Sequence, residues 1–353
     1  MDAAGLRRTL KTLQPTSPTT AILDGAPILI ACSNDYLGLA RQAATTHTVV
    51  GHGCGSSRLI SGTRPIHRTL EDALEAWLGA PCLLFSSGFQ ANLAVYATLC
   101  DADQVIASDA LNHASIIDGL RLSKATKTIV PHLRPDAIDA SVDAIAIEGL
   151  FSMDGDIPDL TQYPSGPILA VDEAHALGCI GPNGRGVAAA QGITPDIIVG
   201  TFGKALGASG AFVCAPQTFI DLLINQGRAF IYSTAPSETV LHQTLDNLHH
   251  LQQHGDALRE TLRARTDQFR EGLATLNLEA LGMAHIVPVI LRERTMPVAA
   301  SLLAQGILAT GIRYPTVARG EERIRFTVSA AHTPDQIDQI LDALDRAIQQ
   351  TRE

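Results

Sequence analysis

Two reactive side chains each follow an apolar segment. Asp172 ends PILAVD, and Lys204 follows IIVGTFG in a turn rich in glycine and alanine. In open α/β sheets the ligand crevice lies beyond the carboxyl ends of the strands, so a carboxylate and an amine delivered there can face one site. Each residue alone has an ordinary alternative, an aspartate that caps a helix and a lysine in a surface turn. The prediction of a shared site therefore rests on the pair.

The surroundings of Lys204 favour an unusual amine. A lysine between Gly203 and Gly207, directly after an apolar strand, is expected to be partly desolvated. Desolvation lowers the pKa of a lysine and makes it a nucleophile for Schiff-base formation. A carboxylate such as Asp172 suits the pyridinium nitrogen of pyridoxal 5'-phosphate, which needs such a partner to act as an electron sink. We therefore predict pyridoxal phosphate as the cofactor.

The phosphate of that cofactor needs its own anion site. CLLFSSGFQANLAVYATL fits a strand, a Ser-Ser-Gly turn and an apolar helix that begins near Phe89. Free backbone N–H groups and the helix dipole would converge near Gly88 and Phe89. An ordinary strand–helix turn explains the segment equally well. Thr201, Ser233 and Thr234 could add hydroxyl groups.

His113, in DALNHASIIDGL, begins a further predicted helix beside Asn112, a possible N-cap. A single histidine in this place usually caps a helix or packs in the core. Its functional interpretation is a flat ring that stacks on an aromatic cofactor.

Three other binding motifs fit less well. GTFGK lacks the full spacing and the following hydroxyl of a P-loop. Asp172, Glu173 and His175 could ligate a metal, but no second cluster has the spacing of a metallohydrolase, so we expect no metal site. The glycines of VVGHGCGSS precede no apolar helix, and Glu71 lies inside a predicted helix instead of at a strand end. A dinucleotide site is therefore disfavoured.

The chain has 353 residues and a formal net charge of −10 at pH 7, from 26 Lys and Arg against 36 Asp and Glu. Hydrophobic residues make up 46% and charged residues 18%, as in a compact protein with a large core. Nucleic acids and anionic membranes are disfavoured as partners because both require clustered cations. An anionic ligand would need a locally built site.

The cysteine pattern and the N-terminus bear on location. The cysteines show neither CxxC pairs nor zinc spacing, so we expect most to be buried small hydrophobes. The N-terminal segment has no apolar stretch like that of a secretory signal, and no apolar run approaches the ~18–20 residues of a membrane span. We expect a cytoplasmic protein. The cysteines are Cys32, Cys54, Cys82, Cys100, Cys179 and Cys214.

Short apolar runs, separated by helical patterns, predict the elements that carry these residues. Such runs indicate strands covered on both faces, and hence an α/β fold with a mostly parallel sheet. Thr69 and Asp72 form a possible capping box at the start of one helix, and Gly79 would end it. The predicted strands are 82–85, 104–107, 143–147, 167–171, 196–202 and 210–214.

The pattern changes after about residue 236. A long helical stretch, broken near Gly255, precedes strand-like segments at 285–292 and 323–329, a helix around MPVAASLLAQG and a last helix from Pro334. This order predicts a small α+β domain. The predicted organisation is an N-terminal arm (1–30), a large α/β domain (31–240), and a connector with the small domain (241–353).

Taken together, these segments resemble the α-oxoamine synthases, pyridoxal-phosphate enzymes of fold type I. The family condenses an amino acid with an acyl-CoA and releases CO2. The resemblance covers about residues 30–335 and implies a homodimer whose active site lies at the interface. The NHASIIDG, FSMDGD and TVSAAHT motifs are most similar to members that use L-alanine and pimeloyl-CoA or pimeloyl-acyl-carrier protein. The remaining motifs include SNDYLGLA, GSSRLISGTRPIHRTLE, FSSGFQAN, VDEAHALG, TFGKALG, IYSTAPS and RIRFTVSAAHT.

The resemblance implies a role for each matching position around the cofactor. Lys204 would form the Schiff base and serve as general base. Asp172 would pair with the pyridine nitrogen, and His113 would stack on the ring. The other implied contacts are Ser152 and His175 on the phenolic oxygen side, Gly88, Phe89 and Thr201 at the phosphate, and Ser233 and Thr234 from a neighbouring subunit.

The resemblance also implies the substrate contacts. Arg325 would hold the amino-acid carboxylate, and Thr316 would contact the acyl substrate. Glu148 and Asn34 would position the substrate or support the groups that do.

The sequence departs from the family pattern in places. For the arginine that meets the distal acyl chain, Arg8 and Lys11 are the nearest candidates, and both stay open. ALGC after DEAH and Tyr314 are also unusual. The alternatives within the family are glycine-using 5-aminolevulinate synthases and 2-amino-3-oxobutyrate ligases, serine palmitoyltransferases and autoinducer synthases. A catalytically inactive relative would be expected to lack Lys204 or Asp172.

Overall fold

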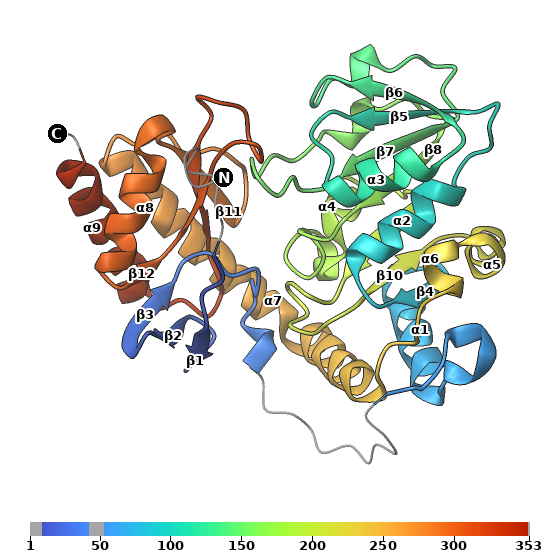
Figure 1. Ribbon diagram of the computed structural model, residues 1–353, viewed down its shortest axis with the longest axis horizontal. Coiled ribbons are helices and arrows are strands. Elements are labelled where there is room, and N and C mark those ends of the chain that lie inside the picture. The colour runs from blue at the N-terminus through green and yellow to red at the C-terminus, as the bar shows by residue number, and fades with distance from the viewer. Residues whose placement is uncertain (1–8, 42–52, 352–353) are drawn as a thin grey trace. The chain divides into compact units, whose positions relative to one another are not determined.

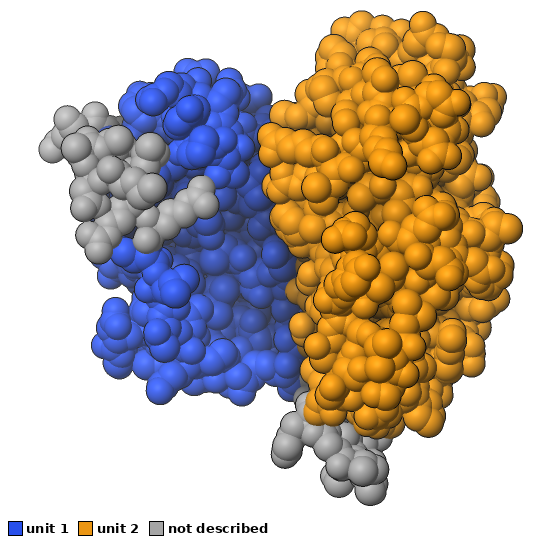
Figure 2. Space-filling model, turned by 45° about the vertical axis from the view of Figure 1, so that its right-hand side comes forward, with its two compact units in different colours: residues 1–41, 152–156, 257–353 blue, residues 42–151, 157–256 orange. Residues whose placement is uncertain are grey.

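The computed structural model describes residues 9–41 and 53–351 (Figure 1). The chain divides into two compact units (Figure 2). Unit 1 comprises residues 1–41, 152–156 and 257–353, and unit 2 comprises residues 42–151 and 157–256. The predicted division into an arm, a large domain and a small domain stays a prediction.

Unit 2 is built on a seven-stranded sheet of order β4-β10-β9-β8-β7-β5-β6. β10 is antiparallel to both neighbours, and every other pair is parallel. The predicted strands and the mostly parallel sheet are thus confirmed. The strands are β4 (Cys82–Phe85), β5 (Val105–Asp109), β6 (Thr126–Val130), β7 (Ala144–Glu148), β8 (Ile168–Asp172), β9 (Ile197–Thr201) and β10 (Ala211–Cys214).

Helices cover the sheet, and α2 and α3 lie side by side over one face (Figure 1). Gly119 permits this close approach, because a Cβ there would lie 2.8 Å from the Asn92 carbonyl oxygen. Val95, Ile106 and Ile116 are fully buried in the core of this unit, and each such side chain contributes roughly 1.5–3 kcal/mol by burial. The helices of unit 2 are α1 (Pro65–Leu78), α2 (Gly88–Thr98), α3 (Ala114–Leu122), α4 (Gly186–Ala190), α5 (Gln217–Gln226) and α6 (Arg228–Ile231).

Two helix boundaries correct the sequence predictions. α1 begins at Pro65, with Arg64 as N-cap, so the capping box predicted at Thr69 and Asp72 is wrong. Proline at the first helical position is a strong start signal, because its missing N–H would have no acceptor there. The predicted end is confirmed: Gly79 follows α1 with a φ of 92°, in the left-handed region that favours glycine.

α7 (Glu238–Thr275) contributes residues to both units and runs without a break through Gly255. The break predicted there is therefore wrong. A glycine inside a helix costs only about 1 kcal/mol relative to alanine. Burial of Leu251 and Leu262 on the flanking turns outweighs that cost.

Unit 1 contains two smaller sheets. The first has the order β1-β2-β3-β12, and the second, β11-β14-β13, is antiparallel. The predicted C-terminal α+β pattern is confirmed. The elements are β1 (Leu13–Pro15), β2 (Thr20–Leu23), β3 (Ala26–Ile30), β11 (Ile286–Ile290), α8 (Thr295–Ala304), β12 (Ile307–Leu308), β13 (Thr310–Ile312), β14 (Arg323–Thr327) and α9 (Pro334–Gln350).

Short helical turns complete the chain. They are the 3₁₀ turns η2 (Leu39–Arg41), η4 (Pro135–Ala137), η5 (Leu160–Gln162), η6 (Pro182–Gly184) and η7 (Arg292–Arg294), and the π-helical η3 (Arg58–Gly62). All six cysteines are free thiols, and Cys54, Cys82, Cys100 and Cys214 are buried as predicted. Within residues 9–41 and 53–351, no helix has the length and apolar character needed to cross a membrane.

Candidate active site

A cavity of about 190 Å³ lies in unit 2 where β7, β8 and β9 end. Its volume is more than ten times the ~10–15 Å³ that one water molecule requires. Its position, beyond the carboxyl ends of parallel strands, is where ligands bind in open α/β sheets. The lining includes eight of the predicted residues: Gly88, Phe89, His113, Glu148, Asp172, His175, Thr201 and Lys204.

Asp172 is the last residue of β8 and is almost fully buried. One carboxylate oxygen, Oδ2, accepts a hydrogen bond from Asn92 Nδ2 at 2.7 Å, and Oδ1 accepts one from the Ala174 backbone N–H at 2.9 Å. These two donors, one to each oxygen, fix the orientation of the Asp172 carboxylate at the cavity.

Glu148 ends β7 directly beside Asp172 in the strand register. Burial and the neighbouring Asp172 carboxylate raise the pKa of Glu148 to about 8, although the Lys204 ammonium and the His113 backbone N–H act in the opposite direction. Because two adjacent carboxylates repel each other when both are ionised, we assign the proton at neutral pH to Glu148. The pair then carries one negative charge.

Glu173, the next residue of the chain, is also completely buried. Its Oε2 and Oε1 accept the backbone N–H groups of Val187 and Ala188 at 3.0 and 2.8 Å, in the first turn of α4. No room remains around this carboxylate, because a Cβ at Gly149 would lie 2.4 Å from Oε2. Glu173 thus holds α4 and does not line the cavity.

Lys204 lies in a tight turn after β9 and is half-buried. The turn is closed by hydrogen bonds from the Gly207 N–H to the Lys204 carbonyl at 2.9 Å and from the Ala208 N–H to the Phe202 carbonyl at 2.8 Å. The fully buried Phe202 ring anchors it. The backbone therefore fixes where the Lys204 side chain starts, while the predicted lowering of its pKa stays a prediction.

The first turn of α2 forms an anion cradle. Ser87 is the N-cap, and its hydroxyl accepts the Gln90 N–H at 3.2 Å. Gly88 and Phe89 follow, and N–H groups at these positions have no acceptor within the helix. A Cβ at Gly88 would lie 3.8 Å from the Cβ of Thr201, so a larger residue would fill the cradle. These N–H donors fit the phosphate of the predicted cofactor. The Thr201 hydroxyl lies beside them and donates to the Gly210 carbonyl oxygen at 3.0 Å in this structure.

Ser233 and Thr234 do not line the cavity. In this chain, Gln90 Nε2 donates a hydrogen bond to Ser233 Oγ at 2.5 Å, and Ser86 Oγ donates one to the Thr234 carbonyl oxygen at 3.4 Å. Both residues therefore lie beside the anion cradle of their own chain. Their contribution to a neighbouring subunit stays a prediction.

His113, and not Asn112, is the N-cap of α3, which corrects the predicted cap. The His113 side chain accepts the Ser115 N–H at 3.3 Å through Nδ1. Asn112 is buried and donates instead to Ser108 Oγ and the Ala146 carbonyl. Burial lowers the pKa of His113; the Asp172 carboxylate raises it and Lys204 lowers it further. The ring is thus neutral at neutral pH and can stack on a flat ligand.

Two buried arginines on β14 of unit 1 differ in their partners. Arg323 forms ion pairs with Asp154 and, at 3.7 Å, with Glu321. Arg325 donates to neutral oxygens, the Ser152 carbonyl and Asn34 Oδ1. Within the described part of the chain no carboxylate pairs with Arg325, so its charge is available to an acidic ligand.

The remaining predicted residues belong to unit 1. Ser152, Asn34 and Arg325 lie together there. Thr316 is exposed, and its backbone N–H donates to the Arg313 carbonyl oxygen in a turn. Their relation to the cavity of unit 2 stays a prediction. Lys11 is exposed, whereas Arg8 lies outside the described residues.

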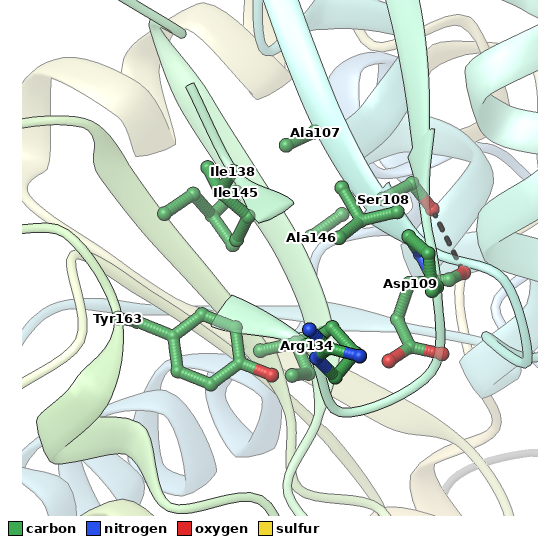
Figure 3. Close-up of a pocket in the computed structure, with 11 residues that line it drawn as sticks. Ala107, Ser108, Asp109, Arg134, Ile138, Ile145, Ala146 and Tyr163 are labelled. Atoms are coloured by element: carbon green, nitrogen blue, oxygen red, sulfur yellow. Dashed lines mark hydrogen bonds between the residues drawn. The ribbon is translucent and has the colours of Figure 1, made fainter. Parts of the chain in front are cut away.

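A second pocket, at β5 and β7, is too small to bind a cofactor (Figure 3). Its volume is about 10 Å³, enough for about one water. Tyr163, Arg134 and Asp109 are among the residues that line it (Figure 3). Glu71, the acidic residue of the rejected dinucleotide motif, is buried in α1 and pairs with Arg58 at 2.9 Å.

The sequence prediction missed two polar residues of the cavity, Asn92 and Ser115. Asn92 is a buried polar residue one turn into α2, and Ser115 follows His113 by two positions. The sequence carried a signal for both residues, because a polar side chain on the buried face of a helix needs a hydrogen-bond partner.

Residues 27–344 match the family model for aminotransferase class I and II. A protein from Desulforudis audaxviator, described as a putative 8-amino-7-oxononanoate synthase, is 40% identical over 373 residues, covering 99% of this chain and 97% of that protein. The 8-amino-7-oxononanoate synthase of Citrifermentans bemidjiense is 37% identical and covers 98% and 95%.

Solved structures agree. Serine palmitoyltransferase of Sphingomonas wittichii superimposes with a TM-score of 0.91 at 27% identity, covering 99% of this chain and 94% of that one. 8-Amino-7-oxononanoate synthase of Francisella tularensis gives 0.80 at 30% identity, covering 92% and 98%.

Proposed function

Because the chain belongs to the class I and II aminotransferase family, we propose that it is a pyridoxal-phosphate-dependent 8-amino-7-oxononanoate synthase of biotin biosynthesis. The reaction joins L-alanine to pimeloyl-CoA, or to pimeloyl-acyl-carrier protein. A carbon–carbon bond forms at the alanine α-carbon, the thioester breaks to release the thiol, and the alanine carboxylate leaves as CO2. The observation that carries the proposal is the one cavity shared by Lys204, Asp172 and the first turn of α2.

The groups around the cavity suit this chemistry. When bound, pyridoxal phosphate supplies an electron sink for the amino-acid α-carbon. Lys204 Nζ would hold the cofactor and would serve as general base toward the amino-acid α-proton. The Asp172 carboxylate holds the proton on the pyridine nitrogen, and the neutral Glu148 beside it adds no second charge. The His113 ring covers one face of the cofactor.

The remaining cofactor contacts follow from the cradle and the family resemblance. The N–H groups of Gly88 and Phe89 and the hydroxyl of Thr201 bind the phosphate. His175, which lines the same cavity, and Ser152 bind on the side of the phenolic oxygen.

For the substrates, the unpaired charge of Arg325 supports a role in binding the amino-acid carboxylate. Asn34 holds the Arg325 guanidinium and is itself held by the Tyr36 hydroxyl, which donates to Asn34 Oδ1 at 3.1 Å. Thr316 contacts the acyl substrate.

Replacing Lys204 tests the assignment. Lys204→Ala should keep the melting temperature of the parent protein but lose covalent cofactor attachment and turnover with L-alanine and pimeloyl-CoA. The purified parent protein should be yellow, or become yellow when pyridoxal phosphate is added. A protein that stays colourless, or a Lys204→Ala variant with full activity, would contradict the proposal.

Serine palmitoyltransferase is the second candidate, because its structure superimposes most of this chain. The two candidates differ in the amino acid they use. We expect L-alanine to perturb the cofactor spectrum at lower concentration than serine or glycine. In Arg325→Ala the alanine concentration that gives half the maximal rate should rise, while the dependence of the rate on the acyl donor should be unchanged. Preference for serine would favour the second candidate, and for glycine the aminolevulinate or aminooxobutyrate enzymes.

The proposal includes a homodimer in the cytoplasm. Ile60 in η3 and Tyr232 after α6 are strongly exposed apolar side chains, in segments that contact each other near Ser233 and Thr234. Exposed apolar surface of this kind suits a subunit interface. Sedimentation at micromolar concentration should give twice the chain mass. The free cysteines suit a reducing compartment.

A further inference from the structure

Asn92 lies at the centre of a buried hydrogen-bond chain that links Asp172 to His113. Only 2% of Asn92 is exposed. Its Nδ2 donates to Asp172 Oδ2 at 2.7 Å and to Ser115 Oγ at 2.8 Å. A side-chain amide has two N–H protons, so both are used. The reverse orientation of the amide would set its oxygen against the Asp172 carboxylate, so this orientation is chemically required.

Ser115 passes this constraint to the histidine. Its Oγ accepts from Asn92, so its own proton must be donated elsewhere, and His113 Nδ1 lies 2.7 Å away. The Ser115 backbone N–H also points at Nδ1, at 3.3 Å. Two donors directed at one ring nitrogen require that nitrogen to be unprotonated. The proton of the neutral His113 ring is therefore on Nε2.

We propose that Asn92 is a positioning residue whose single amide group fixes the Asp172 carboxylate and, through Ser115, the neutral Nε2–H tautomer of His113. This inference rests on the proposed function, in which the two residues hold the pyridine nitrogen and the ring face of one cofactor. Asn92 thus fixes the orientation of the Asp172 carboxylate and the proton position of the His113 ring at once.

Other charged groups also face His113. Asp172 on β8 favours a protonated ring and Lys204 after β9 disfavours it, while Glu148 on β7 interacts with the His113 backbone N–H. Replacing Asn92 also frees the Asp172 carboxylate, so that variant alone does not separate the hydrogen-bond chain from the surrounding charges. Ser115→Ala leaves the bond between Asn92 and Asp172 in place, so a change of His113 in that variant reports the hydrogen-bond chain.

The first measurement uses the parent protein. In ¹⁵N-histidine-labelled protein with pyridoxal phosphate added, the nitrogen shifts of His113, identified by their loss in His113→Gln, should show protonation at Nε2. The spectrum can be recorded whether or not the cofactor binds, so a failure of the proposed function is distinguishable from a failure of this inference. Protonation at Nδ1 would overturn the inference.

Two variants separate the two branches of the chain. Asn92→Leu removes both donors at similar size, and we expect mixed His113 tautomers, a higher His113 pKa and a shifted pH midpoint of the cofactor absorption. Ser115→Ala should change only the His113 signals. Activity in Asn92→Leu should fall about 10–100-fold in kcat, with the KM for alanine nearly unchanged.

Asn112→Leu is the matched control. Asn112 is also buried and donates two hydrogen bonds, to Ser108 Oγ at 2.9 Å and the Ala146 carbonyl at 2.8 Å, but these acceptors are outside the chain that joins Asp172 to His113. Asn112→Leu should leave the His113 tautomer and the pH midpoint of the cofactor absorption as they are in the parent protein. Equal shifts in Asn112→Leu and Asn92→Leu would show general loosening and overturn the inference. So would an unchanged His113 spectrum in Ser115→Ala.

Discussion

Asp172 and Glu173, two buried carboxylates at the end of β8, lie in contrasting surroundings. On the cavity side, Asp172 receives two hydrogen bonds and still borders open space. Glu173, the next residue, also receives two, but Gly149 and Gly186 press against it and leave no space. Hydrogen bonding alone therefore does not distinguish a functional carboxylate from a structural one. The accessible volume beside it does.

The largest difference should come from Asp172→Asn. The amide cannot balance a positive pyridine nitrogen, so kcat/KM for alanine should fall by about 10²–10³-fold or more, the scale of losing one electrostatic partner. The free energy of unfolding should fall by about 1–3 kcal/mol, because the amide nitrogen would face one of the two donors that now bond the carboxylate. Steady-state kinetics and urea unfolding measure the two. A variant that is fully active would place the pyridine partner elsewhere.

Glu148 extends the contrast to a carboxyl that binds a proton. Its pKa is about 8 in the fold and 4.5 in the unfolded chain, so the folded state holds the proton to higher pH. Stability should therefore fall as pH rises from about 4.5 to 8, by on the order of 5 kcal/mol at about 1.4 kcal/mol per unit, and then level off.

Glu148→Gln should lack that fall. Urea unfolding of cofactor-free parent and variant at pH 5 and pH 8.5 provides the measurement, with the variant gaining relative stability at the higher pH. Parallel profiles would mean that Glu148 is ionised throughout.

Glu173→Gln should lower the free energy of unfolding and leave the turnover rate unchanged. Its amide nitrogen would face a backbone N–H, leaving a buried donor unsatisfied at a cost of about 1–3 kcal/mol. The folded fraction should keep the turnover of the parent. A lower denaturant midpoint with unchanged kcat would support the contrast with Asp172, and a lower kcat at unchanged stability would remove it.

The smallest effect is expected for Ser87→Ala, on the cavity side. Loss of this N-cap costs about 1 kcal/mol and loosens the first turn of α2. Cofactor affinity, measured by fluorescence titration, should weaken slightly while kcat at saturating cofactor is retained. Thr333→Ala, the N-cap of α9 in unit 1, should cost similar stability without a change in cofactor affinity. If Ser87→Ala and Thr333→Ala lost the same cofactor affinity, the anion cradle would not be the site that binds the phosphate.

The sequence was most informative where burial is greatest. Strands covered on both faces have uninterrupted apolar residues, so β4, β5 and β7–β10 were predictable. β6 was not, because it is an edge strand with mostly exposed residues and the mixed sequence TKTIV. β2 and β3 were also missed, although Asp24 and Gly25, both with positive φ, form the Asp-Gly turn that is a typical hairpin signal.

The site divides in the same way. Lys204, Asp172 and the first turn of α2 were predictable because each follows a strand that the apolar pattern located. Asn92 was not assigned a role, because the need for it arises only when α2 packs against β8 and α3. Its partners are distant in sequence, and nothing in the local pattern names them.

The antiparallel strand β10 has a consequence for how the protein is made. β4 is an edge strand whose partner in the sheet is β10, so the turn at Gly88 gains its place beside Thr201 only when β9 and β10 have joined the sheet. During synthesis the chain must therefore extend beyond Cys214 before the anion cradle is complete. Contacts between such distant segments form slowly. A ribosome-bound chain that ends between Lys204 and β10 would carry this lysine before the anion cradle is complete.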